Sequence, residues 1–165
     1  MDDRLRQLAI EVVVREARLL DERAWDDWLA LYDEQAVFRV PAWRDEDELT
    51  QDPERELSLM HLRGRAMLAE RVARIRSGLS AASKPLPRTN HLVTGFLVSG
   101  DEGAGALVRS AWTTHAWLHK DAELVTYTGR YEHALHWTGG AWRIRRKTVV
   151  LVNDRLASPV DVFHL

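Results

Sequence analysis

Hydrophobic residues recur at helical spacing in the first half of the chain and at alternating spacing in the second half. Apolar residues over positions 5–20 follow steps of three and four, which predicts an amphipathic helix of about four turns. Asp21 is expected to cap a second, shorter helix over positions 25–32. A third helix is predicted over about 65–77 and should end at Gly78.

Two short strands are predicted in the sequence before the third helix. A strand over 37–40 is expected to stop at Pro41, because proline donates no backbone hydrogen bond. The almost wholly polar segment 44–56 contains a proline and predicts an exposed loop, after which a second strand is expected over 57–62. Two prolines predict another loop over 80–89.

From His91 onward, four long β-type runs are separated by short segments of turn residues. In the run that ends at Trp137, apolar and polar residues alternate, which predicts two different strand faces. One face carries Val125, Tyr127, Tyr131, Leu135 and Trp137. We therefore expect an α+β fold, in which a cone-shaped, curved and mainly antiparallel sheet packs on about three N-terminal helices within one domain of residues 1–165.

Composition excludes several classes of protein. Cysteine is absent, which excludes disulfides, thiolate zinc sites, cysteine nucleophiles and iron–sulfur clusters held by cysteine. The net charge of −2 provides no basic field for nucleic acid, and no apolar run is long enough to cross a bilayer. The acidic N-terminal sequence does not resemble a signal peptide, so a cytoplasmic protein is expected.

Charge is distributed unevenly along the chain. Residues 1–60 carry 17 acidic against 8 basic residues, a net charge of −9, whereas residues 61–165 carry 8 acidic against 15 basic residues, a net charge of +7. This split is typical either of a solvated acidic loop or of complementary faces for self-assembly. The seven tryptophans allow the same two interpretations, because tryptophan fills cores and is also enriched at interfaces.

The histidine spacings do not match a metal site. His115 and His119 lie in a predicted strand, where four residues span about 13 Å, too far to share one ion. His133 and His136 are expected to point to opposite strand faces. The sequence also lacks the motifs of phosphate-binding loops, dinucleotide-binding folds and serine hydrolases. No metal or cofactor is therefore expected in this chain.

Arg146 is predicted to face the interior. In a regular strand it has the same parity as Trp142, Ile144, Val150 and Val152, which are expected to be buried. A buried arginine needs a carboxylate partner, so Arg146 would support the structure or line a cavity. The sequence pattern indicates no inward-facing carboxylate.

Five segments, in order along nearly the whole chain, resemble the small (β) subunits of aromatic-ring-hydroxylating dioxygenases. They are EARLLDERAWDDWLALY at 16–32, VPAW at 40–43, RVARIRSG at 71–78, PRT at 87–89 and RRKTVVLVND at 145–154. Within that group, the stretch 40–59 and the final residues look most like β subunits of the benzoate, toluate and anthranilate type.

The resemblance implies the cone fold of nuclear transport factor 2 and a structural role without a redox centre. In such enzymes the large (α) subunit carries a Rieske [2Fe–2S] cluster and a mononuclear iron, and adds both atoms of O₂ to an aromatic ring to give a cis-dihydrodiol. The implied partners are that large subunit and further copies of this chain, commonly as three α plus three β, without nucleic acid or membrane. The candidate interface residues are Trp43, Arg88, Arg130 and Arg145.

Two alternatives remain open on the same fold: a stand-alone isomerase or dehydratase, and a small-ligand binding protein. Either would use residues lining the cone cavity, for which the candidates are Tyr127, Tyr131, His133 and Arg146. The missing inward carboxylate argues against the isomerase or dehydratase, because the reaction of either enzyme needs a base. The fold alone does not decide between these functions.

Overall fold

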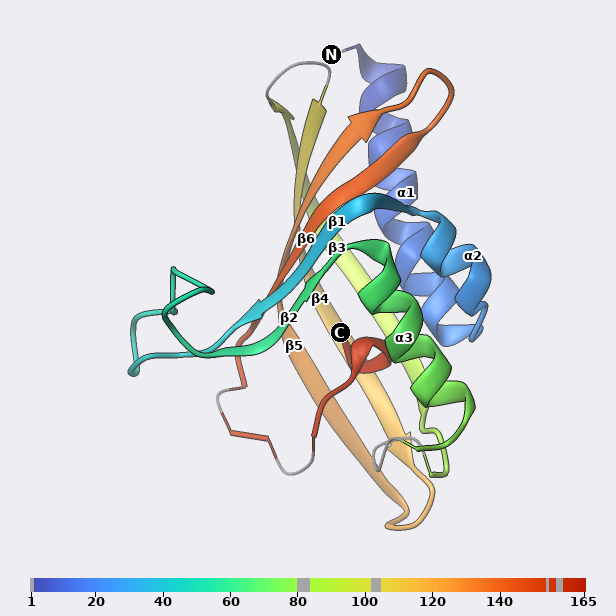
Figure 1. The fold of residues 1–165 in the computed structure, drawn as a ribbon, viewed down its shortest axis with the longest axis vertical. Coiled ribbons are helices and arrows are strands. Elements are labelled where there is room, and N and C mark those ends of the chain that lie inside the picture. Colours follow the sequence, from blue (N-terminus) through green and yellow to red (C-terminus); the bar gives the residue numbers. More distant parts are fainter. Residues whose placement is uncertain (1, 80–83, 102–104, 154, 157–158) are drawn as a thin grey trace.

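Three helices cover one face of a six-stranded sheet, and the opposite face carries no helix in the described part of the chain (Figure 1). The computed structural model describes residues 2–79, 84–101, 105–153, 155–156 and 159–165. The helices are α1 (Asp3–Asp21), α2 (Trp25–Ala30) and α3 (Arg65–Arg76), with a final 3₁₀ turn η2 (Val162–His164). The strands are β1 (Tyr32–Pro41), β2 (Ser58–Arg63), β3 (Arg88–Asp101), β4 (Gly105–Leu118), β5 (Glu123–Trp137) and β6 (Trp142–Leu151). The predicted α+β architecture is confirmed.

The sheet is open and mixed, with the strand order β2-β1-β6-β5-β4-β3. Strands β3 to β6 form the predicted antiparallel meander. Strand β1 pairs in parallel with β6 and antiparallel with β2, so the first strand lies against the last one. The first and last strands of the chain are therefore neighbours in the middle of the sheet.

Most of the predicted elements are confirmed, but several bounds differ. Helix α2 ends at Ala30, short of the predicted Tyr32, and β3 begins at Arg88, inside the predicted loop over 80–89. Helix α1 is longer than four turns, because the Asp2 carboxylate accepts the Leu5 amide proton and caps its first turn. Strand β1 begins at Tyr32, earlier than expected, and includes Pro41. The predicted loop over 80–89 and the first turn after His91 fall partly outside the described residues, at 80–83 and 102–104.

The role predicted for Asp21 is wrong. Asp21 is the last residue of α1, and α2 begins after Ala24 without a side-chain cap. The Asp21 carboxylate instead accepts hydrogen bonds from the His91 backbone amide and the Thr89 hydroxyl, both at 2.8 Å. It also lies 2.6 Å from His91 Nδ1, so it joins the end of α1 to β3.

Strand β5 alternates as predicted, but β6 does not. Tyr127, Tyr131 and Leu135 are buried on the helix-covered face. In β6, Ala134 pairs with Arg146 while Leu135 pairs with Ile144, so Arg145 is the extra residue of a β-bulge.

The bulge reverses the side-chain parity of the rest of β6. Lys147, Val149 and Leu151 are buried, whereas Arg146 is exposed. The predicted inward orientation of Arg146 is therefore wrong, as is that of Val152, which is exposed, and Val150 is only half-buried. An extra residue exchanges the two faces of a strand, because side chains alternate with a period of two.

The main core lies between the helices and the inner sheet face. Ala9, Val13 and Leu20 of α1 are buried there together with Phe38 and Ile144. None of the helices in the described residues is both long enough and apolar enough to cross a membrane.

Replacing Trp28 with alanine is expected to lower the free energy of unfolding by about 3–5 kcal/mol, the usual cost of truncating a buried tryptophan. Trp28 is fully buried, packs edge-on against Tyr32 at 5.0 Å and donates its indole proton to Glu16. Trp117→Ala is the control, because Trp117 lies 36% exposed on the outer face. Urea denaturation followed by circular dichroism measures both losses, and equal losses would contradict this account.

Candidate functional site

A buried polar cluster joins α1 to the sheet, with the Glu16 carboxylate at its centre. Glu16 Oε1 accepts hydrogen bonds from Trp28 Nε1 and the Tyr32 hydroxyl, both at 2.8 Å. The Lys147 ammonium lies 2.9 Å from each of the two carboxylate oxygens. Both charged side chains are fully buried. Glu16 therefore receives donors from α2, β1 and β6 at once.

The contacts of Lys147 require its charged form. Its Nζ atom donates to both Glu16 oxygens and, at 3.1 Å, to the backbone oxygen of Leu165, which uses all three ammonium protons. Burial lowers the pKa of Lys147, and the Glu16 carboxylate opposes that shift. For Glu16, burial favours the neutral acid, but the Lys147 ammonium and the nearby His133 together outweigh burial and hold the pKa of Glu16 well below its usual range.

Two residues predicted to line a cavity lie beside this cluster. Tyr131 stacks on Trp112 with ring centroids 5.0 Å apart, and His133 packs edge-on against Tyr131. His133 Nε2 is 3.8 Å from Glu16 Oε2, too far for a hydrogen bond. Burial lowers the pKa of His133, which favours the neutral imidazole. These side chains pack closely as parts of the interior.

The other two predicted cavity residues lie elsewhere. The Tyr127 ring contacts His164, with centroids 4.9 Å apart, towards the other end of β5. Arg146 is exposed and forms an ion pair at 3.4 Å with Glu132. The structure thus brings Tyr131 and His133 together and separates Arg146 from them.

Sequence reasoning missed both ions of the cluster. The expectation that no carboxylate faces inward is wrong, because Glu16 is fully buried. Its position offered a signal, since Glu16 lies three residues after Val13 and four before Leu20 on the buried stripe of α1. Lys147 carried no comparable signal, because the bulge at Arg145 decides its face.

The cluster is suited to structure and not to acid–base chemistry. Every donor to Glu16 is a buried side chain of the protein, and the carboxylate has no contact with solvent. In the described part of the chain, no group of three or more histidine, aspartate or glutamate side chains is placed to hold a metal ion.

A second polar feature is the segment between β1 and β2, residues 42–57, which we call the β1–β2 arm. It projects from the sheet on the side away from the helices (Figure 1). Over residues 44–56 it carries seven acidic residues and two arginines. Most of residues 44–56 are exposed, so the predicted exposed loop is confirmed, and its charge is strongly negative.

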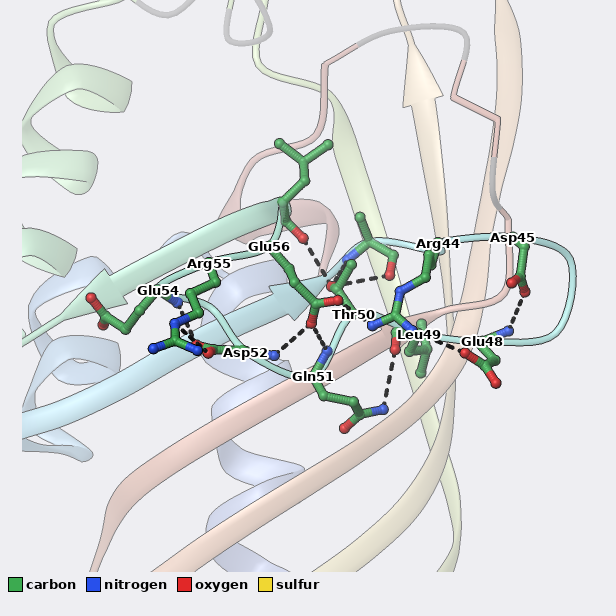
Figure 2. Close-up of polar contacts among 12 residues, drawn as sticks. Arg44, Asp45, Glu48, Leu49, Thr50, Gln51, Asp52, Glu54, Arg55 and Glu56 are labelled. Atoms are coloured by element: carbon green, nitrogen blue, oxygen red, sulfur yellow. Dashed lines mark hydrogen bonds and ion pairs between the residues drawn. The ribbon is translucent and has the colours of Figure 1, made fainter.

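Internal hydrogen bonds give the arm a defined shape, as Figure 2 shows. The Glu56 carboxylate accepts the backbone amide protons of Gln51 and Asp52 at 2.6 and 2.7 Å, and pairs with Arg44. The hydrogen bond from the Asp52 amide lowers the pKa of Glu56 most. With the Arg44 guanidinium and the hydrogen bond from the Gln51 amide, it brings that pKa to about 2. The Thr50 hydroxyl accepts from the Ala42 amide and donates to the Leu57 carbonyl, which closes the base of the arm.

Trp43 lies at the root of this arm. It is half-buried, bridges to Leu49, and donates its indole proton to the Leu151 carbonyl at 2.7 Å. The side chain thus fixes the arm to the end of β6. Part of its surface stays available to a neighbour.

The outer face of the sheet is the third feature. Arg88 and Arg130 are exposed there, and pairing of Arg88 with Trp117 and of Arg130 with Ala111 places them on the same side. Arg145 is exposed at the bulge of β6. The large apolar side chains exposed on the same face are Leu92, Leu97, Trp117, Leu124 and Val152.

Comparisons with known proteins agree along most of the chain. Residues 15–158 match the family model described as "Ring hydroxylating beta subunit". The chain is 37% identical over 150 residues to the benzoate 1,2-dioxygenase subunit beta of Acinetobacter baylyi, covering 91% of this chain and 88% of that protein.

Solved structures show the same fold. The beta subunit of the benzoate 1,2-dioxygenase from Burkholderia mallei is similar with a TM-score of 0.78 and 34% identity, covering 95% of each chain. A protein described as NTF2-like with a cystatin-like fold, from Novosphingobium aromaticivorans, has a TM-score of 0.65 at 16% identity, covering 92% of this chain and 84% of that one. The latter likeness concerns the fold alone and confirms the expected fold class.

Replacing Lys147 with methionine is expected to cost about 3–5 kcal/mol of unfolding free energy, because it leaves the Glu16 charge buried without its partner. The double variant Glu16→Gln/Lys147→Met should recover part of that loss, since it removes both charges. Arg109→Met is the matched control: it breaks the surface pair with Glu132 and should cost less than about 1 kcal/mol. Urea titrations compare the three, and a loss in Lys147→Met no larger than in the control would refute the assignment.

The free energy of unfolding is expected to decrease as the pH is lowered below about 6.5. Burial, then the nearby His91, lowers the pKa of His164 to about 3, and burial also lowers the pKa of His133. Between pH 6.5 and 3 the unfolded chain therefore binds protons that the folded chain does not, so acid favours unfolding. The lowered pKa of Glu16 adds a further loss below its ordinary value of 4.5. Urea titrations from pH 8 to 4 measure the slope. His164→Gln should reduce it between pH 6.5 and 4.5, and an unchanged slope would contradict the prediction.

Proposed function

Because the chain belongs to the family of ring-hydroxylating dioxygenase β subunits, we propose that it is the small, non-redox subunit of a benzoate-type dioxygenase. The observation that carries the proposal is the 37% identity to a benzoate 1,2-dioxygenase β subunit over 91% of the chain. Its role is to hold together an enzyme that cis-dihydroxylates a benzoate-like aromatic compound during aromatic catabolism.

The chemistry of the chain supports a division of labour with a large (α) subunit. A Rieske cluster needs two cysteines beside its two histidines, and this chain has no cysteine. We therefore assign the Rieske cluster and the mononuclear iron to the large subunit. The chain itself is expected to show no oxidation of aromatic compounds when purified alone.

The alternative of a stand-alone isomerase or dehydratase is not favoured. Such an enzyme needs an accessible base, but the Glu16 carboxylate is fully buried and is neutralised by Lys147. Tyr131 and His133 are likewise buried in contact with one another.

We propose that the outer sheet face and the root of the arm form the contacts of a three α plus three β assembly. Support comes from exposed apolar side chains on a face that no described helix covers, flanked by Arg88 and Arg130. Interfaces commonly combine such apolar centres with arginine. Trp43 and Arg145 remain proposed contacts at the edge of this surface.

The double variant Arg88→Glu/Arg130→Glu is expected to fold but to assemble poorly, because it places two negative charges on the proposed interface. Co-expression with the large subunit, followed by co-purification and light scattering, measures assembly. Arg74→Glu, a charge reversal at another exposed arginine, on the helical side, should assemble like the wild type. A wild-type chain that stays monomeric and fails to bind the large subunit would overturn the proposed function.

A further inference from the structure

The last five residues return to the helix-covered side of the sheet and are buried there. The segment 161–165, which we call the strap, lies between the sheet and α3 (Figure 1). Each of its five residues is at most 2% exposed. Such complete burial is unusual for a segment that forms only one short 3₁₀ turn.

Two basic side chains hold the ends of the strap. At its start, Arg71 of α3 pairs with the Asp161 carboxylate at 2.8 Å. At its end, Lys147 of β6 donates to the Leu165 oxygen at 3.1 Å. Between them, the His164 ring packs against Tyr127 of β5. The strap therefore bridges a helix and two strands through side chains.

The backbone amides of Asp161, Val162, His164 and Leu165 all donate within the strap. The Asp161 carboxylate accepts the Val162 amide proton, and the His164 ring accepts the Asp161 amide proton at 3.0 Å. The His164 and Leu165 amides donate to carbonyls within the strap. Within the described residues, no backbone–backbone hydrogen bond joins the strap to a strand or a helix. Its departure would therefore break no part of the sheet ladder.

The surface beside the strap contains polar groups that lack partners. Thr114 pairs with His91 on one side and Tyr127 on the other, so these three residues form a row across β3, β4 and β5. The Thr114 hydroxyl and the His91 Nε2 atom are buried without a hydrogen-bond partner among the described residues. Buried polar groups are normally hydrogen-bonded, so these two atoms have unused hydrogen-bonding capacity beside the strap.

We propose that the strap occupies a binding groove on the inner sheet face as an intramolecular ligand. We further propose that it leaves this latent groove as a unit while the sheet stays folded. The groove offers the Lys147 ammonium for an oxygen acceptor, the row of His91 and Thr114 for polar groups, and an apolar surface where Phe163 lies. It accepts a short chain segment with the chemistry of residues 161–165. This inference does not depend on the proposed function.

Hydrogen exchange read by mass spectrometry tests whether the strap opens separately. In the full chain, the amides of 162–165 should exchange faster than those of β5. Arg71→Ala should raise strap exchange about tenfold, because it removes the Arg71 guanidinium from the buried Asp161 carboxylate, and should leave β5 unchanged. Arg76→Ala, which breaks a surface pair of equal length on the same helix, is the control and should change neither. Equal exchange of strap and β5 in the wild type and in Arg71→Ala would overturn the proposal.

A peptide experiment tests the groove itself. The free pentapeptide Asp-Val-Phe-His-Leu, added to a full chain carrying Phe163→Ala, should bind and slow exchange near Tyr127. A scrambled pentapeptide and the wild-type chain are the controls, and neither combination should show binding. Arg71→Ala serves as the acceptor if Phe163→Ala fails to fold. An opened strap without specific peptide binding would show that no latent groove exists.

Discussion

The buried ion pair between Glu16 and Lys147 is the interaction on which most of this structure depends. It joins the middle of α1 to β6, and the same carboxylate accepts protons from Trp28 and Tyr32. The pair thus connects a helix and a strand through two residues that are 131 positions apart in sequence. A buried pair of this kind contributes less to net stability than its geometry suggests, because desolvation opposes it, but removing one partner is costly. The contact therefore sets Lys147 of β6 directly against the Glu16 carboxylate of α1.

One extra residue in β6 makes this pair possible. Without the bulge at Arg145, the alternation of the strand would turn Arg146 inward and Lys147 outward. With it, a lysine reaches Glu16, while Arg145 and Arg146 are added to the exposed surface. The same local irregularity thus completes the interior and supplies basic residues to the outside.

The two faces of the sheet consequently have different roles. The inner face is filled by helices, by the Glu16 cluster and by the strap, so the interior resembles a closed core. The outer face and the β1–β2 arm carry exposed apolar, arginine and acidic side chains. This distribution suits a subunit whose function lies in its contacts. It agrees with a family whose members are named as β subunits of larger dioxygenases.

The sequence by itself determined the helices, the meander, the alternation of β5 and the family, because each depends on local periodicity or on residues that match in order. It did not determine the face of Lys147, the partner of Glu16 or the role of Asp21. A bulge leaves no periodic signal of its own, and its position is decided by pairing with β5. Likewise, whether a carboxylate at the end of α1 caps the next helix or binds β3 depends on which donor the fold brings nearest. Asp21 meets the Thr89 hydroxyl and the His91 amide only because the chain returns to it 68 and 70 residues later. Such long-range contacts are products of tertiary structure, since no local preference distinguishes them from their alternatives.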